Sequence, residues 1–283
     1  MDHWPSSAPE RIGIVLIGDE LLSGKRSDKH MPRVIEILDA RGMELSWARM
    51  VGDDAGLLEQ TLRETMRSSD IVFSFGGIGA TPDDRTRQCA ASAAGVALEF
   101  NAEGRALLEA RFGDEAYPKR IHMVEWPVGA RVIPNPVNQV PGFSFGHHHF
   151  VPGFPNMAWP MVEWVLDTHY AHLQREERNV ERLLEVLDTP ESALIDLMQH
   201  VMDAHPDVRI ACLPSASGKR SIEFGVRGRP VAADNAFRAL IDALETGRNQ
   251  IFLSASRRQA NIFRSYIVEF VYRVTGTMLT GEA

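Results

Sequence analysis

At 283 residues, the chain is longer than a typical domain of about 100–150 residues, so we expect two domains. Hydrophobic residues make up 44% of the chain and charged residues 24%, as is typical of a globular protein with a buried core. The formal net charge of −8 argues against a surface for nucleic acid or anionic lipid, because such surfaces depend on clustered Lys and Arg. We therefore expect a small-molecule ligand or a protein partner, with no nucleic acid and no membrane.

The cysteines and the amino terminus predict a cytoplasmic protein. Cys89 and Cys212 are too few and too far apart in sequence for a disulfide framework or a zinc site, so each is predicted to be a small buried apolar residue. Residues 1–10 lack the apolar region of a secretory signal. No run approaches the roughly 18 apolar residues that suggest a membrane span.

Strand and helix patterns alternate along the first 170 residues. The continuous apolar runs 11–17 and 70–75 predict strands that are buried on both faces. Between them, residues 28–41 have helical spacing, with Ser27 or Asp28 as the N-cap. The pattern also predicts the following elements: a strand over 43–50, helices over 57–66, 84–97 and 101–112, a hairpin over 131–155, and a helix over 156–172 with Pro160 in its first turn. This alternation predicts an α/β domain with a parallel sheet covered by helices on both faces.

The polar stretch 174–179 is the predicted domain boundary, because few contacts would need to cross it. Beyond it, the segment 180–186 is compatible with either a strand or a helix. Two further helices and two strands complete a small α+β domain over 178–250. An apolar stripe predicts a final helix within 251–283 that packs on the body or on another subunit.

Three polar loops follow predicted strands, at residues 18–24, 76–86 and 152–156. In open α/β sheets, ligands bind in the crevice beyond the carboxyl ends of the parallel strands. All three loops could therefore face one site.

The loop 76–86 is rich in glycine and ends with two aspartates. Its glycines would let the backbone approach a ligand and direct N–H groups at an anion; they are Gly76, Gly77 and Gly79. Thr81 adds a hydroxyl group. Asp83 and Asp84 cannot themselves attract a phosphate, so they suggest a divalent cation or hydrogen bonds to ligand N–H groups. In the simpler alternative, the glycines make a turn and the aspartates cap the next helix.

Other polar and aromatic clusters have less specific interpretations. Asp19 and Glu20 either cap the next helix or contact a ligand or metal. The three consecutive histidines 147–149 cannot all converge on one metal, because neighbours on a strand point to opposite faces, so a solvated turn is predicted. Trp159 and Trp164 are predicted to lie in the core or an interface.

Taken together, the three loops and the Pro-Gly-Phe at 141–143 resemble the molybdopterin-binding domain of the molybdenum-cofactor biosynthesis (MoaB/Mog-like) superfamily. The pattern is most similar to the competence/damage-inducible protein A (CinA) branch, in a short form without the amidohydrolase domain. The resemblance covers about residues 10–170. It implies a doubly wound three-layer sandwich over 10–172, and the region 180–250 resembles the KH-like domain of that branch.

The resemblance also implies a ligand and a chemistry. Members of the CinA branch are metal-dependent pyrophosphatases for ADP-ribose and, in relatives, FAD. The implied ligand-binding residues are Gly18, Asp19, Glu20, Gly76, Gly77, Gly79, Thr81, Asp84, Pro152 and Gly153. The implied mechanism uses a divalent Mg²⁺, Mn²⁺ or Co²⁺ ion held by Asp84, with Asp83 or Glu20 assisting.

Two functions remain open from the sequence. One is a nucleotide pyrophosphatase, with Asp84, Asp83 and Glu20 as its catalytic residues. The other is a non-catalytic protein that binds molybdopterin or a nucleotide, because Arg120, Met123 and residues 138–140 differ from the family pattern. In either case we expect a homo-oligomer, a dimer or a trimer.

Overall fold

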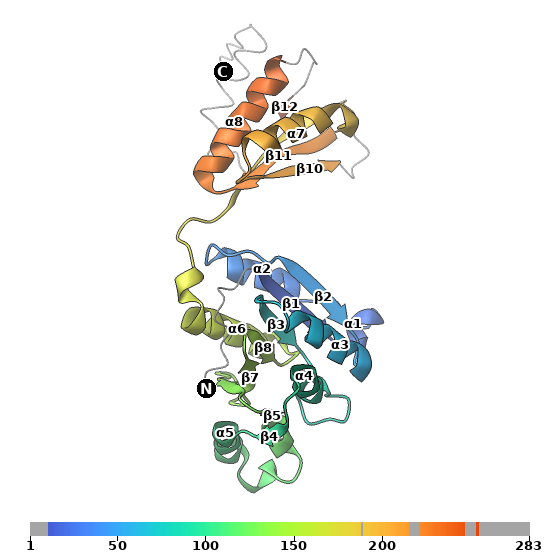
Figure 1. The fold of residues 1–283 in the computed structure, drawn as a ribbon, viewed down its shortest axis with the longest axis vertical. Helices are drawn as coiled ribbons and strands as arrows, with labels where there is room; N and C mark the ends of the chain where they lie inside the picture. Colours follow the sequence, from blue (N-terminus) through green and yellow to red (C-terminus); the bar gives the residue numbers. More distant parts are fainter. Residues whose placement is uncertain (1–10, 188, 215–220, 247–252, 255–283) are drawn as a thin grey trace, which may run out of the picture. The chain divides into compact units, whose positions relative to one another are not determined.

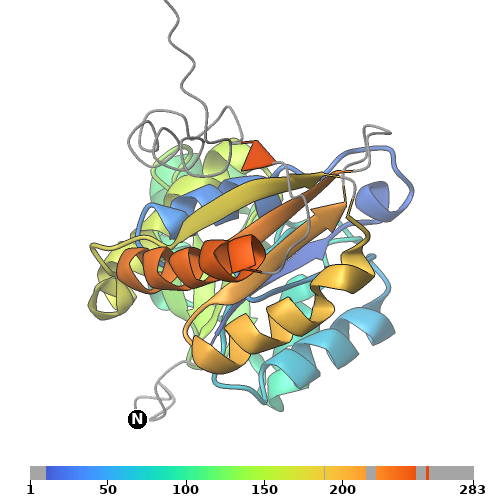
Figure 2. The same cartoon turned by 90° about the horizontal axis from the view of Figure 1, so that it is seen from above.

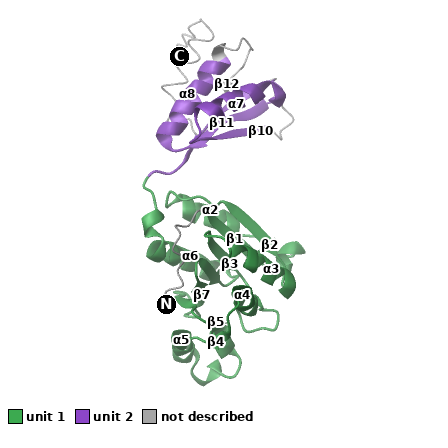
Figure 3. Ribbon diagram, viewed as in Figure 1, with its two compact units in different colours: residues 1–176 green, residues 177–283 purple. Residues whose placement is uncertain are grey.

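The computed structural model of the protein describes residues 11–187, 189–214, 221–246 and 253–254 (Figure 1). The chain divides into two compact units, residues 1–176 and 177–283 (Figure 3). The division falls within the polar stretch 174–179. Each unit has its own buried core and is described by itself.

The first unit contains a six-stranded sheet in the order β2-β1-β3-β8-β7-β6. Strands β2, β1, β3 and β8 are parallel, whereas β7 and β6 continue the sheet in antiparallel fashion. The strands are β1 (Ile12–Ile17), β2 (Trp47–Val51), β3 (Ile71–Phe75), β6 (Arg131–Ile133), β7 (Gly142–Phe145) and β8 (His148–Val151). The predicted mainly parallel sheet is confirmed, and the predicted hairpin region supplies three of its strands.

Helices cover both faces of this sheet (Figure 1). On β1, Ile14 and Leu16 pack into the core beneath helices α2 and α6, whereas Val15 and Ile17 pack into the core beneath α3, α4 and α5. This alternation follows from the two-residue period of a strand, and it produces the predicted three-layer sandwich. The helices are α1 (Asp19–Leu22), α2 (His30–Asp39), α3 (Ala55–Thr65), α4 (Thr86–Ala94), α5 (Ala102–Phe112) and α6 (Pro155–His169).

Short elements complete the first unit. Strands β4 (Leu98–Phe100) and β5 (Glu125–Pro127) form a separate antiparallel pair. The 3₁₀ helices are η1 (Gly113–Ala116), η2 (Arg120–Val124) and η3 (Ala171–Leu173). Pro160 lies beyond the first turn of α6, contrary to the prediction, because that helix already begins at Pro155.

The second unit is an antiparallel sheet in the order β10-β11-β9-β12, with helices α7 and α8 packed side by side against it (Figure 2). It has an α+β architecture, and the undecided segment 180–186 is a strand. The elements are β9 (Val180–Leu187), η4 (Glu191–Leu194), α7 (Ile195–Ala204), β10 (Arg209–Pro214), β11 (Ser221–Gly228), α8 (Pro230–Thr246) and β12 (Leu253–Ser254). A final helix was predicted within residues 251–283. The structure describes only Leu253 and Ser254 of this range, which form β12, so the predicted helix lies outside the described residues.

Candidate functional site

The parallel strands of the first unit end level with one another. Val51 pairs with Ile17 across β2 and β1, and Phe75 pairs with Val151 across β3 and β8. Because parallel strands all point the same way, the loops that follow them leave from one edge of the sheet. This edge, which we call the carboxyl edge, carries the three loops predicted from the sequence and a fourth one after β2.

Close backbone contacts hold the loops together. A Cβ on Gly76 would lie 2.6 Å from the carbonyl oxygen of Ile17, and a Cβ on Gly153 would lie 3.5 Å from the Cα of Gly76. The Gly18 amide donates to the Val51 carbonyl at 3.0 Å. The structure therefore brings the loops 18–24, 76–86 and 152–156 into contact at the carboxyl edge.

The start of the loop 76–86 requires glycine. Gly76 and Gly77 have φ angles of 108° and 67°, which side chains of L-residues rarely adopt. A Cβ on Gly77 would also lie 2.1 Å from Oγ1 of Thr86, which is fully buried and donates to the Gly76 carbonyl at 3.0 Å. The first turn of α4 thus fixes the path of the glycine loop.

Four consecutive amide groups in this loop are without an acceptor in the part of the chain that the structure describes. Among the described residues, the N–H groups of residues 77–80 donate no hydrogen bond. Their neighbours are all satisfied: Gly76 donates to Val151, Thr81 to Asp84, and Thr86 to Gly77. A run of backbone amides without acceptors, next to the amino end of a helix, is the arrangement with which proteins bind anionic oxygens.

Asp84 closes the loop internally rather than capping α4. Its Oδ2 accepts hydrogen bonds from the amide of Thr81, at 3.0 Å, and from the Thr81 hydroxyl. The N-cap of α4 is Arg85, which makes no capping bond with its side chain. The side chain of Asp83 is exposed. The simpler alternative, in which these aspartates cap the helix, therefore does not describe the structure.

Asp19 faces an aspartate that the sequence reasoning did not select. The amide of Asp19 donates to Oδ2 of Asp53 at 3.0 Å, and the amide of Asp53 donates to Oδ1 of Asp19 at 3.1 Å. Burial raises the pKa of Asp53, as do the neighbouring charges of Asp19, Glu20 and Asp83. The carboxyl edge therefore gathers acidic side chains from three loops. The place of Asp53 directly after a strand, like that of Asp19, was the signal that could have found it.

Arg87 is a second residue that the sequence did not reveal. Only 3% of it is exposed, and its guanidinium donates to the carbonyls of Gly79 at 2.9 Å, Glu125 at 3.4 Å, and His122. It therefore ties the glycine loop to the segment that carries η2 and β5. Nothing in the sequence shows that this arginine is buried rather than exposed, because the groups that it binds are backbone carbonyls of residues that are distant in sequence.

His30 is a third such residue. It lies in the first turn of α2 and is 6% exposed, with its Nε2 3.1 Å from the Gly153 carbonyl and its ring 4.4 Å from the ring of Phe75. Burial lowers its pKa, so a neutral imidazole that donates from Nε2 fits this position. His30 thus joins the loop 152–156 to Phe75 at the end of β3.

The histidines 147–149 are not in a solvated turn, and that prediction was wrong. All three are buried, and the last two belong to β8 in the interior of the sheet. His148 Nε2 lies 2.9 Å from Oγ1 of Thr65, whereas His149 and His147 both contact the Tyr170 hydroxyl, at 2.8 and 3.0 Å. The alternation of the strand sends His148 to one face and its neighbours to the other. These side chains are core hydrogen-bond partners.

The two cysteines differ in burial. Cys89 is buried on α4, as predicted, whereas Cys212 on β10 is only partly buried. Burial raises the pKa of both thiols, so neither is poised as a thiolate nucleophile.

The carboxylates of the carboxyl edge do not form a metal site by themselves. Within the described ranges, no three His, Cys, Asp or Glu side chains are gathered closely enough to hold a metal ion. A metal at Asp83 and Asp84 would therefore need oxygens of a bound ligand to complete its coordination.

The family model described as "Probable molybdopterin binding domain" matches residues 13–172, which is more than half of the chain. The chain belongs to this molybdopterin-binding domain family. Its matched region begins on β1 and ends just after α6, so it contains all the loops of the carboxyl edge. The resemblance inferred from the loop motifs is confirmed.

Relatives of this molybdopterin-binding domain carry the name CinA. A CinA-like protein of Anaeromyxobacter sp. (strain Fw109-5) is 36% identical over 203 residues, covering 69% of this chain and 49% of that protein. One from Citrifermentans bemidjiense is 32% identical over 210 residues, covering 71% and 50%. The chain thus spans about half the length of the curated relatives it matches.

A solved structure supports the fold assignment. The protein CinA of unknown function from Thermoplasma acidophilum is similar with a TM-score of 0.52 and 25% identity, over 57% of this chain and 98% of that one. Among the described residues, no helix has the length and apolar character needed to cross a bilayer.

Proposed function

We propose that the carboxyl edge binds a nucleotide pyrophosphate of the ADP-ribose or FAD class and hydrolyses it with a divalent metal. The observation that carries the proposal is the run of amides at 77–80, which finds no acceptor among the described residues and lies beside the amino end of α4. Its glycines permit a phosphate to approach the backbone closely. Phosphate oxygens are the acceptors that suit such a loop best.

The acidic side chains beside the amides explain why a metal belongs in the proposal. A pyrophosphate next to Asp83, Asp84 and Glu20 would be repelled unless a cation lay between them. Oδ2 of Asp84 is anchored by Thr81, whereas its Oδ1 accepts no hydrogen bond from the described residues. Asp84 and Asp83 would hold the metal together with ligand oxygens, and such a metal supplies charge stabilisation to a pyrophosphate under attack.

Asp53 is the residue of this edge that fits the role of general base. Its pKa is raised by burial and by three nearby carboxylates, and a base with a raised pKa accepts a proton more readily. The two hydrogen bonds that Asp53 and Asp19 exchange hold the loop after β2 against the loop after β1. The chain therefore contributes an amide cradle, a metal-holding pair of carboxylates and a base.

The test compares Asp84→Asn with wild type. An asparagine oxygen can still accept from Thr81, so the loop keeps its shape while the negative charge is lost. We expect Mg²⁺- or Mn²⁺-dependent release of AMP from ADP-ribose or FAD to fall by at least about a hundredfold. The control is Glu103→Gln, which alters an exposed residue of α5 and should leave the rate unchanged.

The alternative is a non-catalytic binder of molybdopterin or a nucleotide, and the family description favours it. Calorimetric titration with ADP-ribose and FAD distinguishes the two functions. Binding without AMP release in the presence of Mg²⁺, Mn²⁺ or Co²⁺ would overturn the enzyme proposal and leave the binder. If the protein neither binds these nucleotides nor releases AMP from them, both functions are overturned.

A further inference from the structure

A pocket of 510 Å³ lies outside the loops of the carboxyl edge, within the first unit. It is lined by Asp28, Lys29, Pro32, Arg33, Glu36 and Trp159. Its volume falls within the range of about 300–1,000 Å³ that is usual for small-molecule pockets. All but one of these residues come from α2 and the turn before it, and Trp159 comes from α6.

The topology places this pocket beside the ligand loops. Helix α2 follows the loop after β1, and α6 begins at Pro155, directly after the loop 152–156. Both helices therefore start at the carboxyl edge, and they cover the same face of the sheet. His30 makes the connection, because its Nε2 bonds the Gly153 carbonyl at 3.1 Å and its ring lies 6.5 Å from that of Trp159.

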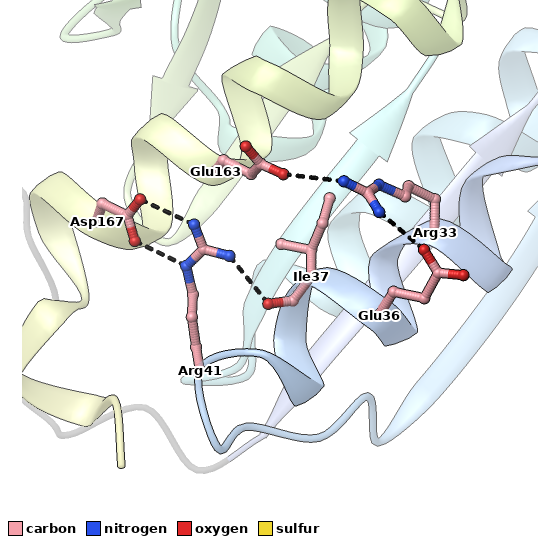
Figure 4. A network of polar contacts seen from close by, with 6 residues as sticks. All are labelled: Arg33, Glu36, Ile37, Arg41, Glu163 and Asp167. Carbon is pink, nitrogen blue, oxygen red and sulfur yellow. Dashed lines mark hydrogen bonds and ion pairs between the residues drawn. The ribbon is translucent and has the colours of Figure 1, made fainter. Parts of the chain in front are cut away.

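Ion pairs hold the two walls of the pocket in place (Figure 4). Arg33 on α2 contacts Glu36 at 2.8 Å and Glu163 on α6 at 3.4 Å. At the other end of the helix pair, Arg41 binds Asp167 through two hydrogen bonds of 2.7 and 2.8 Å. The pocket walls are thus braced before any ligand arrives.

The lining suits a flat, uncharged ring better than a phosphate. Its two cations, Lys29 and Arg33, are balanced by its two carboxylates, Asp28 and Glu36. The side chain of Asp28 already accepts from the amides of His30 and Met31, at 2.8 and 3.0 Å, so the start of α2 is not vacant for an anion.

Aromatic and guanidinium planes supply the stacking surface. The guanidinium of Arg33 lies 5.8 Å from the centre of the Trp159 ring, which is half-buried. Nucleobases and related fused rings stack on such planes. The carboxylate of Glu36, which also lines the pocket, can accept hydrogen bonds from ring N–H groups.

We propose that the pocket between α2 and α6 binds the fused heteroaromatic ring of the ligand whose pyrophosphate occupies the loop 76–86. The inference rests on the proposed function, because the pyrophosphate must be held at the carboxyl edge for its ring to enter this pocket. It assigns ring recognition to Trp159 and Arg33, and it leaves phosphate recognition to the backbone amides.

The test uses two analogues that cannot be hydrolysed. Methylenediphosphonate presents only the phosphate groups, whereas α,β-methylene-ADP adds an adenosine, that is, a ribose and a purine. In wild type we expect the purine analogue to bind more tightly in calorimetric titrations with Mg²⁺. Trp159→Leu should weaken the purine analogue by about 5- to 150-fold and leave methylenediphosphonate unchanged, because stacking involves only the ring.

Trp164→Leu is the matched control, since Trp164 is also half-buried on α6 and packs on the same core but does not line the pocket. It should leave the affinity for both analogues unchanged. A second pair of variants serves if Trp159→Leu does not fold. Arg33→Met should selectively weaken the purine analogue. Arg41→Met, which removes an ion pair between the turn after α2 and α6, should not.

The remaining outcomes of these titrations separate the pocket inference from the proposed function. If methylenediphosphonate binds but the purine adds no affinity, or if Trp159→Leu weakens both analogues equally or neither, the pocket inference is overturned and the proposed function stands. If neither analogue binds the wild-type protein, both proposals are overturned.

Discussion

Replacing Gly77 by alanine tests whether the shape of the glycine loop depends on the absence of a side chain. At a φ of 67°, an alanine costs about 1–2 kcal/mol relative to glycine because its Cβ crowds the backbone. The new Cβ would also lie 2.1 Å from Oγ1 of Thr86, so that hydroxyl must move. Moving it breaks a buried hydrogen bond to the Gly76 carbonyl, which costs about 1–3 kcal/mol more.

Gly95→Ala is the matched control for the backbone cost. Gly95 caps α4 at the opposite end of the same helix, with a φ of 69°, and a Cβ there meets no atom within 4 Å. It should therefore lose only about 1–2 kcal/mol, whereas Gly77→Ala should lose about 2–5 kcal/mol. The difference between the two variants measures the contact with Thr86.

The assay is urea unfolding followed by tryptophan fluorescence. All five tryptophans lie between residues 4 and 164, so the signal reports the first unit alone. Calorimetric titration with methylenediphosphonate should also show weaker binding by Gly77→Ala, because the amides of the loop change direction, and unchanged binding by Gly95→Ala.

A double-mutant cycle with Thr86→Ala decides whether the reasoning is correct. In a protein that carries Gly77→Ala, the Thr86 hydrogen bond is already broken, so adding Thr86→Ala should cost little further stability. The coupling energy between the two substitutions should therefore be about 1–3 kcal/mol. Equal destabilisation by Gly77→Ala and Gly95→Ala, or additive effects in the cycle, would refute the argument.

The remaining predictions concern buried polar side chains. Burial lowers the pKa of His148 to about 3, so between about pH 6.5 and 3 the unfolded chain binds a proton that the folded chain does not, and stability falls as the pH falls. In His148→Gln, the pH dependence of the free energy of unfolding from the urea curves should become shallower by up to about 1.4 kcal/mol per pH unit. The control His172→Gln, at an exposed histidine of the same unit, should keep the wild-type slope, and an unchanged slope in His148→Gln would contradict the assignment. Arg87→Lys should destabilise the first unit by about 3 kcal/mol in the same assay, because an ammonium cannot reproduce the planar contacts with three carbonyls. A loss below about 0.5 kcal/mol would contradict the conclusion that Arg87 ties the glycine loop to the segment with η2 and β5.

Local patterns were sufficient to place most elements of the first unit. The apolar runs 11–17 and 70–75 became β1 and β3, and the helical spacing over 28–41 became α2 with Asp28 bonding its first amides. These signals are local, because the period of a strand or helix is written into a few consecutive residues. The glycine loop was also recognisable, since left-handed backbone at a strand end has few alternatives to glycine.

Sheet order was not determined by the sequence. Strand β8 lies between β3 and β7, so it is hydrogen-bonded on both sides, and all four of its residues are buried. From the sequence, three histidines in a row between turn residues predict a solvated turn. Burial of His148 and His149 follows from this non-local pairing, and their partners Thr65 and Tyr170 are distant in sequence.

The candidate site divides in the same way. The sequence by itself determined the ligand loops, because each one directly follows an apolar strand and contains residues suited to phosphate or metal. Only the tertiary structure joined Asp53 to Asp19, Arg87 to the Gly79 carbonyl, and His30 to the loop at Gly153. The reason is physical: a strand or turn is specified by neighbours along the chain, whereas a hydrogen bond to a distant backbone group exists only after the sheet has brought the two segments together.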